Sequence, residues 1–171
     1  IRFDASLDKL AGLNPVTEGG VITAGNASQI TDGAAAVMVC NDAGLKKIQA
    51  NPRAEIVSIS VVGDDPVFML TGPIPASIQA LKTANLTIDD MDLYEVNEAF
   101  APVPLAWAED LKADRSKLNV NGGAMALGHP LGATGAKLMT TLLHEMERRE
   151  STYGLQAICE GGGTANATII K

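Results

Sequence analysis

The chain has 171 residues, 46% of them hydrophobic, which is enough to bury a core of its own. A net charge of −7 argues against binding to a nucleic-acid backbone, because such binding requires a basic surface. No apolar run approaches the roughly 18 residues of a membrane span, and two cysteines make no disulfide framework, so we expect a cytoplasmic protein without nucleic-acid or membrane partners. Because the chain begins with Ile1 and shows neither a signal peptide nor an obvious translation start, we interpret it as a fragment of a longer protein.

The opening segment, residues 1–20, has little periodicity. Its turn-rich stretch NPVTEGG predicts a linker or a separate substructure that ends near residues 23–26. Beyond it, residues 34–40 and 54–63 are apolar, β-branched runs of strand length, and residues 42–49 between them can form a helix. This pattern predicts a β-α-β unit.

The middle of the chain continues this alternation. A helix is expected to begin in the motif GPIPA, because Pro73 and Pro75 near its start are tolerated where an N–H is not needed. Thr87 lies three residues before Asp90, which is the spacing of a capping box, and a strand is expected at residues 92–96.

The last part of the chain predicts two helices and two strands. Residues 98–113 have a helical composition, with two prolines that must lie in the first turn or kink the helix. The clearest helix begins with Thr134 as its expected N-cap, and we expect its apolar face to be exposed when the chain is alone. That face consists of Leu138, Met139, Leu142, Leu143 and Met146. Residues 154–160 and 166–171 then predict closing strands, which together indicate an α/β layered fold with helices covering the sheet.

Three side chains with reactive potential stand where a strand ends or a helix begins. Asn97 follows a strand in EVNEAF, His129 precedes a helix in the glycine loop GHPLGATG, and Cys159 ends a strand in CEGGG. Open α/β sheets expose functional groups at such places. Since a thiol has a reference pKa of about 8.5 and an imidazole about 6.5, a thiol and imidazole brought together suit acyl transfer or proton abstraction.

Each of these residues also has a purely structural interpretation. His129 can belong to a tight turn, and Asn97 can cap the following helix. Cys40, within AVMVC, is interpreted as a core residue, and His144 as part of a solvated helix face. The glycines fit neither G-x-G-x-x-G nor a P-loop, and two histidines fifteen positions apart make no metal site.

Taken together, the motifs resemble those of one family. TAGNAS, DGAAA, GPIPA, NEAFA, NVNGGAMALGHPLGATG and CEGGG occur in the order found in thiolases. The chain resembles the C-terminal catalytic part of a thiolase, with residues 1–25 similar to the tail of the loop domain and residues 26–171 to the C-terminal domain. The resemblance implies a thiolase-like layered α/β fold, of which this part is a β-α-β-α-β-α-β-β half with a central mixed sheet covered by helices.

The resemblance also implies roles for individual residues. Cys159 matches the cysteine that acts as acid/base on the acetyl-CoA methyl group. His129 matches the histidine that activates the nucleophile and helps to stabilise the thioester enolate, and Asn97 matches the asparagine that holds the water of that oxyanion hole. The amide of Gly161 matches a donor of the second oxyanion hole. The positions that match the lining of the coenzyme A pantetheine tunnel are Ser28, Ala99 and Phe100.

For the full-length protein the resemblance implies thiolytic cleavage of a 3-ketoacyl-CoA or the reverse Claisen condensation of acetyl-CoA. Coenzyme A and acetyl-CoA would be substrates, with no covalently bound cofactor and no metal, and the enzyme would be a homodimer or homotetramer. The motifs YEVNEAFAPVPLAW and CEGGGTANATII are most similar to acyl-CoA acetyltransferases that degrade lipids or steroids. Ala165 and Asn166 stand near a position where many thiolases have glycine, which is a departure from the family pattern.

The family's nucleophilic cysteine lies in its N-terminal half and has no counterpart here, because the position of Cys40 does not match it. We therefore expect no turnover from this chain alone. Other functions stay open: a decarboxylating ketoacyl synthase, whose usual pattern has two histidines and a cysteine; a non-catalytic thiolase-like protein that binds acyl-CoA or lipid; and a structural half that only completes the fold.

Overall fold

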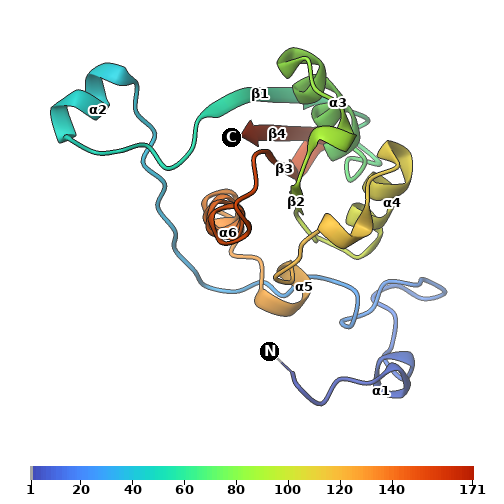
Figure 1. Ribbon diagram of the computed structural model, residues 1–171. Helices are drawn as coiled ribbons and strands as arrows, with labels where there is room; N and C mark the ends of the chain where they lie inside the picture. The colour runs from blue at the N-terminus through green and yellow to red at the C-terminus, as the bar shows by residue number, and fades with distance from the viewer. Residues whose placement is uncertain (1) are drawn as a thin grey trace.

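The computed structural model describes residues 2–171. Its centre is a mixed four-stranded sheet in the order β1-β4-β3-β2 (Figure 1). The strands are β1 (Ile56–Gly63), β2 (Leu93–Val96), β3 (Gly154–Cys159) and β4 (Thr164–Ile170). β4 runs antiparallel to both β1 and β3, whereas β2 and β3 are parallel. The carboxyl ends of β2 and β3 therefore meet at the same edge of the sheet.

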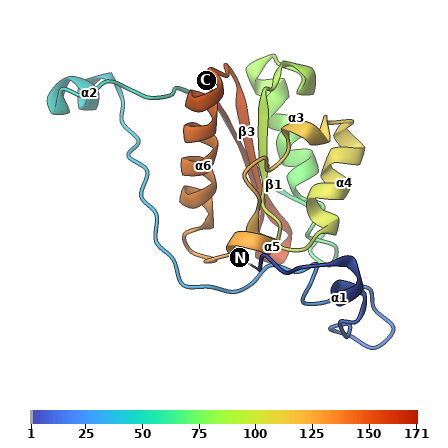
Figure 2. The same cartoon turned by 60° about the horizontal axis from the view of Figure 1, so that its bottom comes forward.

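Helices cover both faces of this sheet, which gives three layers (Figure 2). α3 (Pro73–Ala84) and α4 (Pro102–Leu111) lie on one face, and α6 (Thr134–Arg149) lies on the other. The larger core lies under α3 and α4, where the ring of Trp107 meets that of Tyr94 edge-on at 5.2 Å between centroids. A smaller core joins α6 to the sheet through Leu93, Leu142, Met146 and Ile170. The predicted α/β layered fold with a mixed sheet is confirmed.

The side chains of β2 point alternately to these two layers. Tyr94 and Val96 belong to the core under α3 and α4, whereas Leu93 packs with α6. Because successive side chains of a strand point to opposite faces, Glu95 and Asn97 lie on the α6 side with Leu93. This alternation directs two buried polar side chains toward the layer that carries the glycine loop.

The predicted strand at residues 34–40 is wrong, and with it the predicted β-α-β unit. The segment is extended and exposed, and it has no hydrogen-bonded strand neighbour within residues 2–171 (Figure 1). Val39, for example, is 70% exposed. A run of apolar residues forms a strand only where a neighbouring strand accepts and donates its backbone hydrogen bonds. α2 (Asp42–Ile48) forms as predicted but buries no residue.

The start and the apolar face of α6 also differ from expectation. The N-cap is Ala133, and Thr134 is the first helical residue, with its hydroxyl donating to the carbonyl oxygen of Pro130 at 3.0 Å. Leu138 and Leu142 are buried rather than exposed, because α6 packs directly on the strands of this chain. Exposed apolar side chains lie instead on the outer face of β1, where Val61 is 72% exposed.

The remaining elements are short. They are α1 (Leu7–Ala11), α5 (Ala124–Leu127) and three 3-10 turns, η1 (Ile88–Asp90), η2 (Arg115–Lys117) and η3 (Gly161–Gly163). The expected capping box is present, since the Thr87 backbone N–H donates to the Asp90 carboxylate at 2.7 Å. Both prolines of α4 lie in its first turn, as predicted. Within residues 2–171, no helix combines the length and the apolar character that crossing a membrane requires.

Candidate active site

The site begins at the shared edge of β2 and β3. The backbone N–H of Asn97 donates to the carbonyl oxygen of Ala157 at 3.0 Å, which extends the parallel pairing by one residue beyond β2. Cys159 lies two residues after Ala157, at the end of β3. Two of the three residues singled out in the sequence therefore stand on neighbouring strand ends, with Asn97 buried on the α6 side and Cys159 packed against the core under α3 and α4.

The structure brings His129 to Asn97. The Asn97 Nδ2 and His129 Nε2 atoms are 3.5 Å apart, although 32 positions separate the two residues. Asn97 is 1% exposed and His129 is half-buried, so the imidazole closes over the amide from the loop before α6. The contact is long for a hydrogen bond.

Thr134 sets the protonation pattern of this imidazole. Its Oγ1 lies 2.6 Å from His129 Nδ1. Because the Thr134 hydroxyl donates its own proton to Pro130, its oxygen accepts a hydrogen bond from Nδ1–H. The Nε2 atom therefore carries the lone pair of the ring, which faces the Asn97 amide and can accept a proton, as a general base requires. Burial, together with the nearby ammonium of Lys137, lowers the pKa of His129, which keeps the ring neutral.

The glycines of the loop allow its close approach to other segments. Gly128 has a φ of +87°, and a Cβ there would lie 2.5 Å from the Thr31 hydroxyl. The next residue is held by a hydrogen bond from the His129 backbone N–H to the Gln29 carbonyl oxygen at 2.7 Å. Lys137 donates to the Gly128 carbonyl oxygen at 3.0 Å, which ties the loop back to α6. Glycine is needed here because a side chain would force the loop, and His129 with it, away from the site.

A second set of contacts joins this loop to the end of β2. The carboxylate of Glu98 accepts hydrogen bonds from the Met125 backbone N–H at 3.1 Å and from Asn119 Nδ2 at 3.0 Å. The Asn119 carboxamide also pairs with the backbone N–H and carbonyl oxygen of Val96, as a neighbouring strand would. A Cβ on Gly123 would overlap the Glu98 carboxylate. Residues 119–125 are therefore anchored to the strand that carries Asn97.

Cys159 and the glycines after it stand at the end of β3, the strand next to the one that precedes Asn97. The thiol is half-buried, and this burial raises its pKa, which keeps the proton on sulfur near neutral pH. Gly161 is exposed, with no atom near the place of a Cβ, so its backbone can approach a ligand. Gly163 has a φ of +85° and packs against the backbone of Asp64, so it holds the turn in place.

The three positions assigned to coenzyme A binding are also brought together. The Ser28 backbone N–H donates to the Ala99 carbonyl oxygen at 3.0 Å, and the Ala101 backbone N–H donates to the Asn26 carbonyl oxygen at 2.8 Å. These bonds lay residues 26–28 alongside Ala99 and Phe100, all of them partly exposed. The segment TAGNAS thus forms one wall beside the strand end that carries Asn97.

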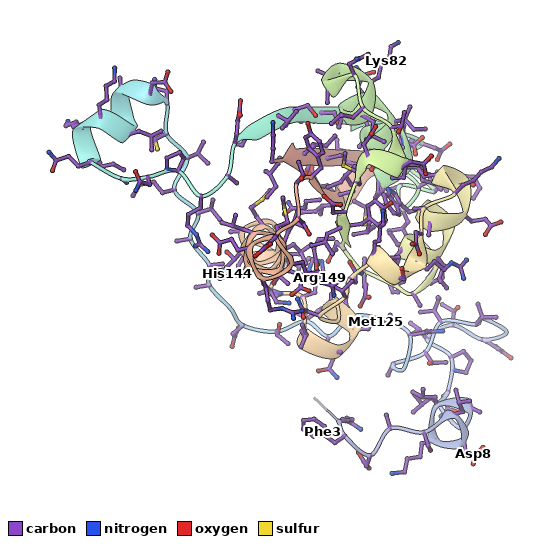
Figure 3. The ribbon with its side chains drawn as sticks, in the orientation of Figure 1. Phe3, Asp8, Lys82, Met125, His144 and Arg149 are labelled. Atoms are coloured by element: carbon purple, nitrogen blue, oxygen red, sulfur yellow. The ribbon has the colours of Figure 1, made fainter. Side chains whose placement is uncertain are left out.

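The second histidine and the second cysteine lie away from this site. His144 is exposed on α6, and its Nδ1 contacts the Thr140 carbonyl oxygen (Figure 3). Cys40 is exposed in the extended segment, which contradicts its interpretation as a core residue. Within the described part of the chain, no three histidine, cysteine, aspartate or glutamate side chains gather closely enough to hold a metal ion.

Sequence reasoning missed the residues that hold the reactive groups in place. The sequence pattern predicts Thr134 as a helix cap, and it does not indicate the roles of Glu98, Asn119 and Lys137. The signal for Thr134 is weak, because a threonine five residues after a histidine in a glycine loop is equally typical of a helix start. These contacts depend on how the loop folds back, which spacing along the chain does not specify.

The Thr134 contact predicts a measurable effect on activity. Thr134→Val keeps the shape of the side chain but removes the oxygen that accepts from His129 Nδ1, so we expect kcat of the full-length protein to fall about ten- to hundred-fold. Thr134→Ser retains the hydroxyl and should stay within about threefold of the unaltered protein. Steady-state kinetics of both variants test this, and equal kcat values for Val and Ser would contradict the assigned role.

Comparisons with known proteins agree with this geometry. The family model described as thiolase, C-terminal domain, matches residues 50–171, and the one described as thiolase, N-terminal domain, matches residues 1–43. The chain is 60% identical over 168 residues to the steroid 3-ketoacyl-CoA thiolase of Mycobacterium tuberculosis, covering 98% of this chain and 41% of that protein. It is 47% identical over 172 residues to an acetyl-CoA acetyltransferase of Cupriavidus necator, covering 100% of this chain and 44% of that protein.

Solved structures give the same result. The fold matches that of human mitochondrial 3-ketoacyl-CoA thiolase in complex with CoA with a TM-score of 0.91 and 46% identity, over 99% of this chain and 43% of the human chain. The chain thus spans about two fifths of the length of these relatives, from 41% to 44%. Because one family model matches most of the chain and both sequence and structure align over nearly all of it, the chain belongs to the thiolase family.

Proposed function

We propose that this chain is the C-terminal part of a thiolase that, at full length, transfers acyl groups between 3-ketoacyl-CoA and coenzyme A. Such an enzyme cleaves a 3-ketoacyl-CoA thiolytically or runs the reverse condensation of acetyl-CoA. The observation that carries the proposal is the contact of the Asn97 amide with the His129 imidazole, 3.5 Å apart, beside the strand that ends in Cys159. An amide, a neutral imidazole and a protonated thiol are the groups that enolate chemistry at a thioester requires.

In the proposed mechanism His129 acts first. With Nδ1–H held by Thr134, the free Nε2 takes the proton of the nucleophilic cysteine, which the rest of the full-length protein would supply. That thiolate attacks the 3-keto carbon and releases acetyl-CoA as an enolate. The enolate oxygen gains negative charge, and Nε2–H together with the Asn97 amide, through a water, would stabilise it.

Cys159 completes the exchange as acid and base. Its raised pKa favours the protonated thiol, which can deliver a proton to the enolate carbon and form the acetyl-CoA methyl group. The resulting thiolate then accepts a proton from incoming coenzyme A, whose thiolate attacks the acyl-enzyme and forms the shortened acyl-CoA. The nucleophilic cysteine leaves in this step and takes back the proton that His129 Nε2 holds. The open backbone of Gly161 suits the amide donor to the carbonyl oxygen during this step.

Coenzyme A is the proposed substrate that both half-reactions share. Ser28, Ala99 and Phe100 form the proposed wall of its pantetheine tunnel, which is supported by the hydrogen bonds that join residues 26–28 to residues 99–101. The human relative was solved in complex with CoA. A steroid or fatty acyl 3-ketoacyl-CoA is the proposed second substrate, because the relative from Mycobacterium tuberculosis is named a steroid 3-ketoacyl-CoA thiolase.

The proposal predicts different activities for the full-length protein and this chain. The full-length protein should cleave acetoacetyl-CoA in the presence of coenzyme A, measured as loss of the 3-ketoacyl thioester and formation of acetyl-CoA. Residues 1–171 alone should show no turnover, because they lack the nucleophile. Turnover by residues 1–171 would overturn the view that the nucleophile lies elsewhere, and inactivity of the full-length protein would overturn the proposed reaction.

A non-catalytic protein that binds acyl-CoA or lipid is the second candidate. Binding of acetyl-CoA by the full-length protein without any thiolysis would support it. The intact Asn97, His129 and Cys159 favour the enzyme instead, since a binding protein has no need of all three.

Three further features are proposed for the full-length protein. We expect it to act in the cytoplasm as a homodimer or homotetramer, without covalently bound cofactor. We also propose that residues 1–25 are the tail of a loop domain and that residues 26–171 form the C-terminal domain. Size-exclusion chromatography with light scattering tests the oligomeric state directly.

A further inference from the structure

A buried polar cluster lies under α6, next to the Asn97 and His129 pair. The side-chain oxygens Glu95 Oε2, Asn97 Oδ1 and Gln156 Oε1 are buried and accept no hydrogen bond within residues 2–171. The three side chains are 2%, 1% and 5% exposed. Leaving a buried oxygen without a hydrogen bond is unfavourable, so three of them on one layer require an explanation.

The sheet places these three side chains on one face. Glu95 and Asn97 are two residues apart on and just beyond β2, which spaces their Cα atoms by about 7 Å. Gln156 is paired with Glu95 across the parallel β2 and β3 strands. Its neighbours Leu155 and Ala157 pack in the core on the opposite face, so Gln156 points to the α6 layer. A glutamate side chain can span to either amide, directly or through one buried water.

An ionised Glu95 would add to the excess of acceptors, whereas a proton on it converts one acceptor into a donor. Burial is the largest influence on this carboxyl, and it raises the pKa of Glu95 to about 8. Among the charged groups that face it, Glu98 and Glu145 raise the pKa further and the Lys137 ammonium lowers it. Glu145 lies farther along α6 and is held by Arg148 and Arg149, so it does not compete for the same partners.

We propose that Glu95 is a positioning residue whose carboxylic acid proton is donated, directly or through one buried water, to Asn97 Oδ1, and so holds the amide with Nδ2 toward His129. An asparagine amide can bind in two orientations, and only one of them presents N–H groups to His129 Nε2. A donor on the Oδ1 side selects this orientation. Gln156, which both donates and accepts, completes the cluster. The inference rests on the proposed function, because its readout is the activity in which Asn97 takes part.

The test uses the full-length protein with acetoacetyl-CoA and coenzyme A. Glu95→Leu removes the donor, and we expect kcat to fall about tenfold or more with KM for coenzyme A within about twofold. Glu95→Gln keeps an uncharged donor and should restore kcat to within about threefold. In an Asn97→Ala background, Glu95→Leu should change kcat less than about twofold, because the group that it positions is gone.

Glu145→Gln is the matched control, since it neutralises another buried acid of the same layer that lies outside the cluster. In the double variant, the fold-changes in kcat caused by Glu145→Gln and by Asn97→Ala should multiply, because the two residues act independently. The ratio of wild-type kcat to Glu95→Gln kcat should also fall as the pH rises through about 8, because the neutral carboxylic acid of Glu95 loses its proton and the amide of Gln does not. Groups that titrate in both proteins affect both kcat values equally, so they do not change this ratio. The ratio therefore tests the positioning role even if Glu95→Leu fails to fold.

Failure of the inference differs from failure of the proposed function. A wild-type protein without thiolysis would refute the function itself. If the wild-type protein is active and Glu95→Leu lowers kcat by the same factor in the wild-type and the Asn97→Ala backgrounds, the positioning role is refuted. A kcat ratio that stays constant between about pH 6 and pH 9 would refute it as well.

Discussion

His129→Ala is expected to lower kcat of the full-length protein by about 10² to 10⁴, which is the contribution of a general base. The imidazole is the group that contacts Asn97 through Nε2 and is held by Thr134 through Nδ1, and alanine replaces neither contact. Stopped assays of acetoacetyl-CoA thiolysis measure the loss. Since the pKa of His129 is lowered, protonation should inactivate the unaltered enzyme only below the ordinary imidazole value of 6.5.

The chain offers its own control for this variant. His144 is the other histidine, and it is exposed on the outside of α6. His144→Ala should therefore leave kcat within about twofold of the unaltered protein, because surface substitutions away from special features have small effects. A loss of similar size in both variants, or full activity of His129→Ala, would contradict the proposed role of His129.

Cys159→Ala is expected to lower kcat by about 10² to 10⁴ for a separate reason, the loss of the acid that protonates the enolate. The most informative measurement is exchange of the acetyl-CoA methyl protons with deuterated water, followed by NMR. This exchange should fall with thiolysis, because both need the Cys159 thiol to move a proton at the same carbon. Transfer of the acyl group to the nucleophile, measured by mass spectrometry, should be less affected.

Cys40→Ala is the matched control for the thiol. Cys40 is exposed in the extended segment, outside the candidate site. The rates of thiolysis and of methyl proton exchange should both stay within about twofold of those of the unaltered protein. Methyl proton exchange that persists at the full rate in Cys159→Ala would assign the acid/base step to another group.

The elements that depend on local pattern were predicted well from the sequence. α6 follows from the repeat of apolar residues at helical spacing, and the proline positions place the starts of α3 and α4. The capping box at Thr87 and Asp90 is also local, since it joins residues three positions apart. Motif order identified the thiolase family, and the contact between Asn97 and His129 agrees with the roles that this resemblance implies.

The errors arose where a distant partner decides the structure. Residues 34–40 have the composition of a strand, but they remain extended without a strand partner among residues 2–171. Thr134 has the composition of an N-cap, but it lies inside the helix and binds His129 instead. In both places the local pattern allows two outcomes, and the presence or absence of hydrogen-bonding partners outside the local segment decides between them.

The glycine loop shows which features follow from the sequence alone and which depend on the tertiary structure. The sequence by itself determined the family and the helix after the loop, and it predicts three candidate reactive side chains, because these depend on residue type and short-range spacing. Only the tertiary structure decided which nitrogen of His129 faces Asn97, and that Glu95 and Gln156 are buried beside them. The physical reason is that tautomers and buried polar contacts depend on neighbours that only the packing of α6 on the sheet brings together.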